Sequence, residues 1–402
     1  MHTISELFKK NIRQYGMNIA LVFKKNIRQY GMIIALVFIT ILFQILTDGI
    51  LLKPLNVTNL ILQNSYILVL AIGMVLVIIT GHIDLSVGSI AAFIGALSAI
   101  MMVEMQLPPF LAVIIALGVG ALIGAWQGFW IAYVRIPAFI VTLAGMLLFR
   151  GLTMIILGGQ SIAPFPNSFQ KISSGFLPDW FGGEGIHILT IVLGVILSLL
   201  VIWKEWKERK TQIKYNFETA PMWIFIAKVA SLVAVVNVFT YVLATYKGIP
   251  NILVILFVLI VIYSFVMNRM IAGRHIYALG GNEKAAKLSG VKTKKVTFWV
   301  FVNMGAMAAL SGLIFAARLN SATPKAGTNF ELDAIAACFI GGASASGGIG
   351  TVIGAIIGGL VMGVMNNGMS LIGLGVDWQQ GIKGLVLLLA VAFDIYNKSK
   401  TN

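Results

Sequence analysis

Few side chains in this 402-residue chain could carry out covalent chemistry. The histidines at positions 2, 82, 187 and 275 are scattered, and the single cysteine, Cys338, lies in an apolar run. The chain has no GxxxxGK[ST] phosphate-binding loop, no HExxH pair and no Cys/His cluster with metal-ligand spacing. The sequence therefore predicts no catalytic residues, no metal site and no bound cofactor, and we expect a protein that is not an enzyme.

One acidic residue stands between two apolar runs, in the segment GHIDLSVGS at 81–89. Asp84 precedes a helical run, so its carboxylate can accept hydrogen bonds from backbone N–H groups at the helix start, and the Ser86 hydroxyl can do the same. A proton relay is the alternative, but a relay needs several ionisable groups along one path and the neighbouring runs supply few. Asp84 and Ser86 are therefore predicted to be structural helix caps.

The composition is that of a protein embedded in a lipid bilayer. Hydrophobic residues make up 59% of the chain and charged residues only 11%, which lies outside the range of soluble globular domains. The net charge of +15 comes from Lys and Arg in short segments between apolar runs. That placement orients membrane helices, and it gives no reason to expect nucleic acid as a partner.

The apolar runs predict an all-α polytopic membrane protein with about ten to twelve transmembrane helices, since one span needs about 20 mostly apolar residues. The run at 333–373 is broken by Gly and Ser near 341–348, so it contributes either two crossings or a re-entrant excursion. The expected spans lie near 32–52, 60–80, 85–104, 110–134, 137–158, 186–203, 222–246, 249–268, 297–317 and 377–395.

Lys and Arg are concentrated in alternate loops, which predicts that both the N-terminus and the C-terminus are cytoplasmic. Two parts of the chain follow from this pattern. Residues 1–32 form a basic cytoplasmic segment, and residues 33–397 form the transmembrane domain. A 15-residue tandem duplication starts within the basic segment. Its two copies are FKKNIRQYGMNIALV at 8–22 and FKKNIRQYGMIIALV at 23–37. We interpret it as a recent local duplication or a gene-model artefact.

A polar, helix-forming segment, GRHIYALGGNEKAAKLSGVKTKK at 273–295, lies between long apolar runs. Its apolar side chains are small or medium and its lysines surround them, so it can neither enter hydrocarbon nor form a core alone. We expect the cytoplasmic loop 269–296 to contact a soluble partner. The alternative is a basic loop that only fixes the membrane topology.

Five segments, in this order, resemble permease subunits of bacterial ATP-binding-cassette importers from the branch that carries ribose, xylose and galactose. The segments are GHIDLSVGS at 81–89, RIPAFIVTLAGMLLFRGL at 135–152, GGQSIAPFP at 158–166, GRHIYALGGNEKAAKLSGV at 273–291 and ELDAIAACFIGGASASGGIGTVIGAIIGGLVMGVMNNGM at 331–369. The resemblance covers nearly the whole chain from about residue 55.

The resemblance implies a permease homodimer in the bacterial cytoplasmic membrane that translocates a monosaccharide. It also implies an extracytoplasmic sugar-binding protein and a cytoplasmic ATPase. The ATPase, and not this chain, would bind and hydrolyse ATP. Force from the ATPase would enter through a short coupling helix in the loop 269–296. The residues that match this motif are Gly280, Gly281, Asn282, Glu283, Ala285, Ala286 and Gly290.

Residues 186–268 depart from the shorter relatives, because they supply about three spans with a basic linker at 204–214 where those relatives have one span. The extra pair resembles xylose and multiple-sugar permeases, which favours xylose or mixed sugars. A nucleoside importer on the same scaffold and an ATP-independent secondary transporter are the alternatives.

Amides within apolar spans need hydrogen-bonding partners, so they can line a path for a neutral polar molecule or bond to a neighbouring helix. Both roles stay open for these residues. The candidates for the substrate path are Asn64, Gln127, Asn303 and Asn366.

Overall fold

The computed structural model describes residues 27–183, 185–217, 219 and 221–399, and within them it contains no β-strand. This confirms the all-α fold. Residues 1–26, and with them most of the duplication, lie outside the described residues. The helices are α2 (Ile27–Leu46), α3 (Pro54–Ile79), α4 (Val87–Ala99), α5 (Pro109–Phe129), α6 (Ala138–Leu157), α7 (Asn167–Ser174), α8 (Ile188–Lys214), α9 (Met222–Ala244), α10 (Asn251–Arg269), α11 (Ile271–Gly281), α12 (Glu283–Leu288), α13 (Thr293–Leu319), α14 (Phe330–Ile340), α15 (Val352–Leu371) and α16 (Val376–Ser399). Helices α4 and α5 each end in a π-helical turn, Ile100–Glu104 and Trp130–Val134.

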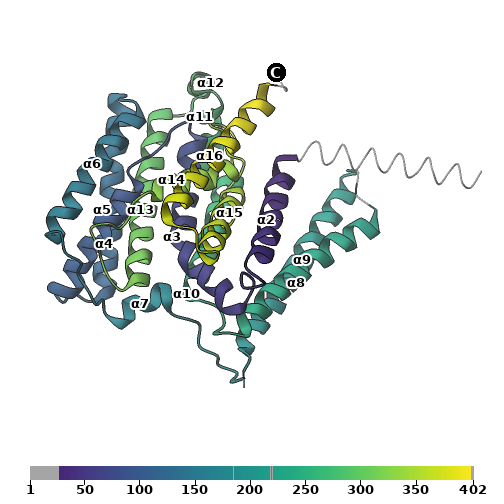
Figure 1. Cartoon of the computed structure of the whole chain (residues 1–402). Helices are drawn as coiled ribbons and strands as arrows, with labels where there is room; N and C mark the ends of the chain where they lie inside the picture. The colour runs from purple at the N-terminus through teal and green to yellow at the C-terminus, as the bar shows by residue number, and fades with distance from the viewer. Residues whose placement is uncertain (1–26, 184, 218, 220, 400–402) are drawn as a thin grey trace, which may run out of the picture.

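Among the described residues, nine helices are long and apolar enough to cross a membrane. Helices α2 and α16 run alongside them, and α14 makes a partial crossing that the following loop completes (Figure 1). The nine spans are one fewer than the lower end of the expected range of ten to twelve, and the shorter apolar helix Gly31–Leu46 lies beside them. The start of α2 and the end of α16 lie at the same end of the bundle as α11 and α12 (Figure 1).

The Gly/Ser-rich break lies in the loop between α14 and α15. Helix α14 has 11 residues and spans about 16 Å, roughly half of the hydrocarbon thickness. The loop then packs on the end of α3, where the Gly348 N–H donates to the Ile79 carbonyl at 2.8 Å. The Thr351 hydroxyl accepts from the Gly354 N–H at 2.9 Å and starts α15. Other groups of the protein thus form hydrogen bonds with the irregular backbone of this loop, as is required at membrane depth.

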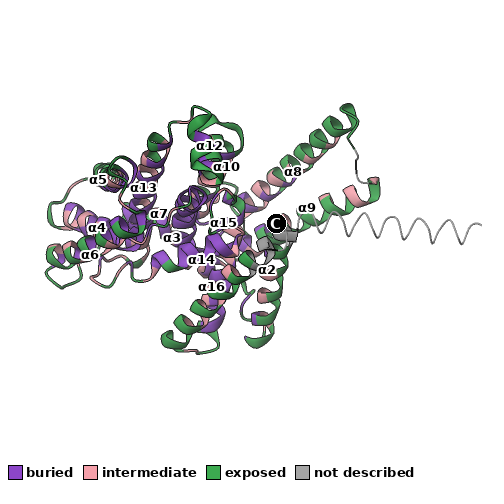
Figure 2. Cartoon of the chain, turned by 90° about the horizontal axis from the view of Figure 1, so that it is seen from above, coloured by how far each residue is buried: buried purple, intermediate pink, exposed green. Residues whose placement is uncertain are grey.

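Helix α3 forms the centre of the bundle and is buried along most of its length (Figure 2). Its second half, from Ile67 to Ile79, is apolar on every side, a pattern typical of a helix enclosed by other helices. Helices α10, α13, α14 and α15 all pack against it. Movement of any of these helices would therefore act on α3.

Helices α5 and α13 approach closely at a row of glycines. A Cβ atom added at Gly124 would meet the Phe301 carbonyl oxygen, and one added at Gly305 would meet the Gly120 carbonyl oxygen. Small residues spaced four apart allow this backbone contact within membranes. The row therefore joins two helices of one chain.

Leucine in place of Gly124 should separate α5 from α13 and lower the thermal unfolding temperature in detergent. Overpacking of a tight contact costs roughly 1–3 kcal/mol or more. Gly118→Leu is the matched control, since nothing lies within 4 Å of a Cβ at that position on the same helix. Equal loss of stability in the two variants would contradict the contact.

Helices α8 and α9 form a hairpin that leans away from the bundle (Figure 1). The basic segment 204–214, expected as a linker, is instead helical and continues α8 to Lys214. Helical propensity of its Lys, Glu and Arg residues explains the difference. The Asn237 amide donates to the Ser198 hydroxyl at 2.8 Å, and Lys228 pairs with Glu205 at 2.7 Å. The hairpin is thus held mainly by its own contacts.

Candidate functional site

Two short helices, α11 and α12, project from the end of the bundle where α2 starts and α16 ends (Figure 1). Their boundaries follow from local chemistry. The Asn282 side chain accepts from the Ala285 N–H at 3.0 Å and caps α12. Gly290, with φ of +87°, adopts the left-handed conformation that ends the segment. The surface-exposed side of these helices forms the candidate site.

Helix α11 is fixed to the bundle by one apolar face and one hydrogen bond. Ile276 and Leu279 are buried against the core. The Tyr277 hydroxyl donates to the Gly350 carbonyl at 2.7 Å, in the loop that precedes α15. Displacement of α11 would therefore act directly on that loop.

The seven residues expected to couple to a partner share one segment but not one environment. Gly280 packs against the Ile79 carbonyl and the Gly348 N–H, and the Ala286 side chain is buried. Gly280 is half-buried and Ala286 is 5% exposed, so these two residues contact the bundle and present little surface to a partner. Gly281, Glu283 and Ala285 are exposed.

Leu288, which the sequence analysis did not assign to the site, is the most exposed large apolar residue on it. Leu288 ends α12 with 90% of its surface exposed. A large apolar side chain at the tip of a polar helix is unfavourable in water unless a partner covers it. The signal in the sequence is the single large apolar residue in EKAAKL, next to lysine.

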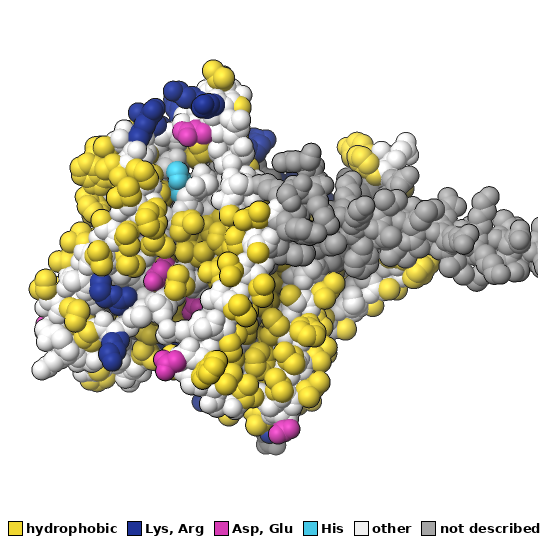
Figure 3. Space-filling view, turned by 45° about the horizontal axis from the view of Figure 1, so that its top comes forward, with side chains coloured by type: hydrophobic (Ala, Val, Ile, Leu, Met, Phe, Trp, Pro, Cys, Tyr) yellow, Lys and Arg dark blue, Asp and Glu magenta, His cyan; other side chains and the backbone are white. Residues whose placement is uncertain are grey.

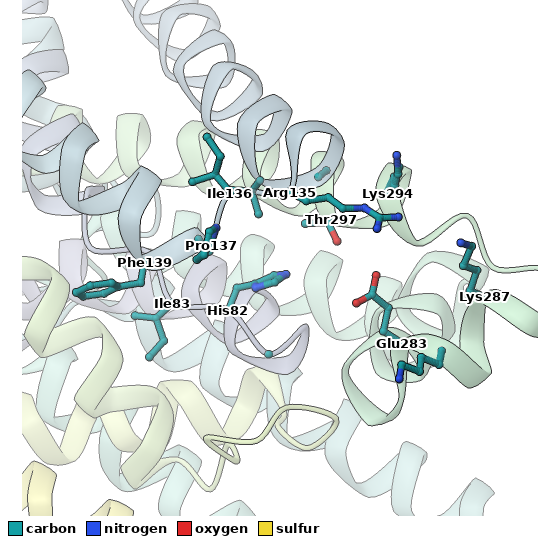
Figure 4. A pocket seen from close by; sticks show the side chains of 15 residues that line it. His82, Ile83, Arg135, Ile136, Pro137, Phe139, Glu283, Lys287, Lys294 and Thr297 are labelled. Carbon is teal, nitrogen blue, oxygen red and sulfur yellow. The ribbon is translucent and has the colours of Figure 1, made fainter.

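A cleft of about 660 Å³ lies beside α12, between it and the turn that leads into α6. Figure 4 shows the Glu283 carboxylate rising from α12 toward Arg135 and Thr297. Of the described residues that line the cleft, Glu283 is the one acid. The cations that line it are Arg135, Lys284, Lys287 and Lys294. The cleft is therefore suited to acidic groups of a partner.

The cleft obtains its shape from the turn between α5 and α6. Arg135 has φ of +68°, in the left-handed region, which turns the chain out of the π-helical turn before Pro137 precedes α6. His82 lines the opposite wall, and burial lowers the pKa of its imidazole although Glu283 opposes this effect. The Lys and Arg residues supply the positive charge of the cleft. Figure 3 shows a group of these basic side chains at the same end of the molecule, above a mostly apolar flank.

The Asp84 carboxylate accepts from the backbone N–H two positions on, as the sequence suggested, whereas the Ser86 hydroxyl caps no backbone group. The Asp84 carboxylate accepts from the Ser86 N–H at 2.8 Å and from the Ser86 hydroxyl at 2.6 Å. The Ser86 hydroxyl also accepts from the Gln127 amide at 2.8 Å. Ser86 occupies the position before α4 but makes no side-chain capping bond, and its backbone is helical (φ −87°, ψ −11°) where a capping residue is usually extended. The network therefore ties the loop before α4 to α5.

Protonation of Asp84 should control stability. Burial raises the pKa of this carboxyl to about 6, and the hydrogen bonds from Ser86 oppose the rise. The native carboxyl thus holds its proton more tightly than the unfolded one. Wild-type stability should fall by roughly 3 kcal/mol at most as pH rises from about 4 to about 6, and then level off.

Asp84→Asn removes this titration and should flatten the pH dependence of thermal unfolding measured in detergent. Glu104→Gln, which removes an exposed acid, is the control and should keep the wild-type slope. A wild-type curve as flat as that of Asp84→Asn would contradict the raised pKa.

The four amides expected on a substrate path do not converge. Asn64 is buried and donates to the Leu60 carbonyl of its own helix, and Gln127 belongs to the Asp84 network. Asn303 accepts a hydrogen bond from the Tyr263 hydroxyl between α13 and α10. Asn366 has a buried side-chain oxygen for which the structure gives no partner. Asn64 packs against Gly363 of α15, and no hydrogen bond recorded among the described residues joins any two of the four amides.

Sequence reasoning also missed charged residues at the start of α14. Lys383 of α16 pairs with Asp333 at 3.1 Å, and the Arg150 guanidinium donates to the Ala326 carbonyl at 2.6 Å. One carboxylate oxygen of Glu331 is buried without a partner among the described residues. The signal is the pair of acids in FELDAIAACFI, three residues and one residue before a wholly apolar stretch.

Comparison with known proteins identifies the family. The family described as branched-chain amino acid transport system / permease component matches residues 56–391. The xylose transport system permease protein XylH of Haemophilus influenzae is 40% identical over 358 residues, 89% of this chain and 93% of that protein. XylH of Escherichia coli K12 is 38% identical over 363 residues, 90% of each chain.

The ribose import permease protein RbsC of Escherichia coli K12 is 35% identical over 340 residues, 84% of this chain and 85% of that protein. No solved structure matches the chain. The family match covers most of the residues, and the relatives are aligned over nearly their full lengths. This chain therefore belongs to the permease components of the branched-chain amino acid transport system family.

Proposed function

We propose that the chain is the permease subunit of an ATP-binding-cassette importer that translocates a monosaccharide, with xylose or mixed sugars favoured. The observation that carries this proposal is the 40% identity to XylH over 89% of the chain. The hairpin α8–α9 supports the xylose branch, since the extra pair of helices is what distinguishes the longer permeases in the resemblance described above.

The proposed coupling surface consists of the exposed residues Gly281, Glu283, Ala285 and Leu288 with the neighbouring cleft. A partner that moves α12 would act on α11, and through Tyr277 on the loop before α15. An ATPase can shift the permease only between states that it contacts differently. A protruding apolar tip flanked by a basic cleft gives it such a contact. The complementary ATPase surface would be an apolar pocket with acidic side chains at its edge.

The family implies an ATPase and a binding protein as partners. In this proposal the ATPase binds ATP, the binding protein delivers sugar from the external side, and two permease chains form a homodimer. The basic residues around α12 support a cytoplasmic position for this end in a bacterial cell, with both termini on the same side. The mostly apolar flank would face the lipid bilayer.

The direct test is transport in proteoliposomes that contain the permease, the ATPase and the binding protein encoded beside its gene. We expect ATP-dependent uptake of labelled xylose, with uptake of ribose as the comparison. Uptake of a nucleoside without sugar uptake would favour the nucleoside importer. Sugar uptake that persists without ATP or ATPase would instead favour a secondary transporter.

A further inference from the structure

A second cavity lies on the flank of the bundle, away from the cleft beside α12. This α10–α13 groove has a volume of about 640 Å³ and is bounded by α10, α11 and α13. Its wall is mostly apolar and includes Val266, Val296 and Val300, and Tyr263 and Asn303 also line it. The proposed coupling surface uses none of these side chains.

The mouth of the α10–α13 groove is basic. Lys292 and Lys295, at the start of α13, line it together with His275 of α11. No Asp or Glu is among the described residues that line the groove, and the structure records no ion pair for either lysine with another described residue. The two ammonium groups therefore offer positive charge to a ligand.

The groove opens toward the side of the protein that lipid would cover. Trp299, on its edge, is 64% exposed, and Phe265 of α10 is 59% exposed. Large apolar side chains at this depth of two membrane-spanning helices are stable only against hydrocarbon or another apolar surface. An occupant would thus enter the groove sideways from the bilayer.

Charge and shape together select one class of occupant. Lys295 and Asn303 are eight positions apart on α13, which corresponds to about 12 Å along the helix axis. A basic mouth at the membrane boundary, followed by an apolar wall of this length, matches a phosphate headgroup followed by an acyl chain. Basic pockets between transmembrane helices on the cytoplasmic side bind anionic headgroups in this way.

We propose that the α10–α13 groove binds an anionic phospholipid, with its phosphate on Lys292 and Lys295 and one acyl chain along Val296 and Trp299. Gly290 and α11 form part of the same wall, so the lipid would brace the base of the α11–α12 segment. Lipid binding itself does not require the proposed sugar transport, and the two ideas can fail separately.

Trp299 provides a local reporter for the test. The full-length permease is placed in nanodiscs that contain equal mole fractions of either brominated phosphatidylglycerol or brominated phosphatidylcholine in the same background. The Trp299 signal is obtained as the difference from Trp299→Phe. We expect roughly tenfold enrichment of phosphatidylglycerol at the groove, seen as stronger quenching of Trp299 by the anionic lipid.

The double variant K292Q/K295Q should lose this excess quenching. K204Q/K210Q removes the same charge from the exposed end of α8 and should keep it. Val296→Phe, which fills the groove without changing charge, should also lose it, and thermal unfolding confirms that each variant is folded. Equal quenching by the two lipids in wild type, or unchanged excess in K292Q/K295Q, would overturn the proposal.

Discussion

Aspartate in place of Leu288 should abolish copurification of the permease with its ATPase and leave the permease folded. The leucine side chain is 90% exposed at the tip of α12, so the isolated permease loses almost no packing when it is replaced. Burial of a leucine in a partner pocket contributes roughly 1.5–3 kcal/mol, which is about a tenfold to hundredfold change in affinity. A buried unpaired carboxylate would weaken the complex further.

The measurement is affinity copurification of the tagged permease with the ATPase, followed by ATPase activity in the presence of the binding protein. Ile213→Asp is the matched control, because Ile213 is also an exposed apolar residue, 53% exposed, near the end of α8. It should leave the complex intact. A complex that survives Leu288→Asp would exclude α12 as the main coupling contact, whatever sugar the permease carries.

Alanine in place of Gly280 should destabilise the permease, whereas alanine at the adjacent Gly281 should not. A Cβ at Gly280 would meet the Ile79 carbonyl oxygen and lie 2.7 Å from the Gly348 nitrogen. These are the two atoms of the hydrogen bond that joins α3 to the loop before α15. Separating them would cost roughly 1–3 kcal/mol and uncouple α11 from the core.

Gly281 is the control for this experiment, since a Cβ there has nothing within 4 Å. The thermal unfolding temperature and the rate of sugar uptake should both fall in Gly280→Ala. The unfolding temperature should be unchanged in Gly281→Ala. Gly281→Asp should also remain folded, but it should weaken the ATPase complex. Equal stability of the two alanine variants would show that the backbone contact at Gly280 is not required.

Local patterns in the sequence were sufficient for the outline of the fold. Apolar runs of span length predicted the helices, and the Gly/Ser break near 341–348 predicted the interruption between α14 and α15. One error came from a basic segment at 204–214, which was expected to be a linker and is helical. Charge predicts exclusion from hydrocarbon but does not decide whether the backbone is helical.

The residues of the candidate site could not all be assigned from sequence patterns. Seven residues of the loop 269–296 were expected to act together, and the structure separates packed Gly280 and buried Ala286 from exposed Glu283 and Ala285. No recorded hydrogen bond joins any two of the amides singled out as a path, because an amide in an apolar run can satisfy its hydrogen bonds on any face of its helix.

The sequence by itself determined the membrane class, the helices and the position of the polar segment, since each depends on the hydrophobicity and charge of neighbouring residues. The tertiary structure alone decided which atoms of that segment contact Ile79 and Gly348, which side chains line the cleft, and that Leu288 is left uncovered. Those features depend on packing between residues far apart in the chain, and local hydrophobicity carries no information about which helices meet.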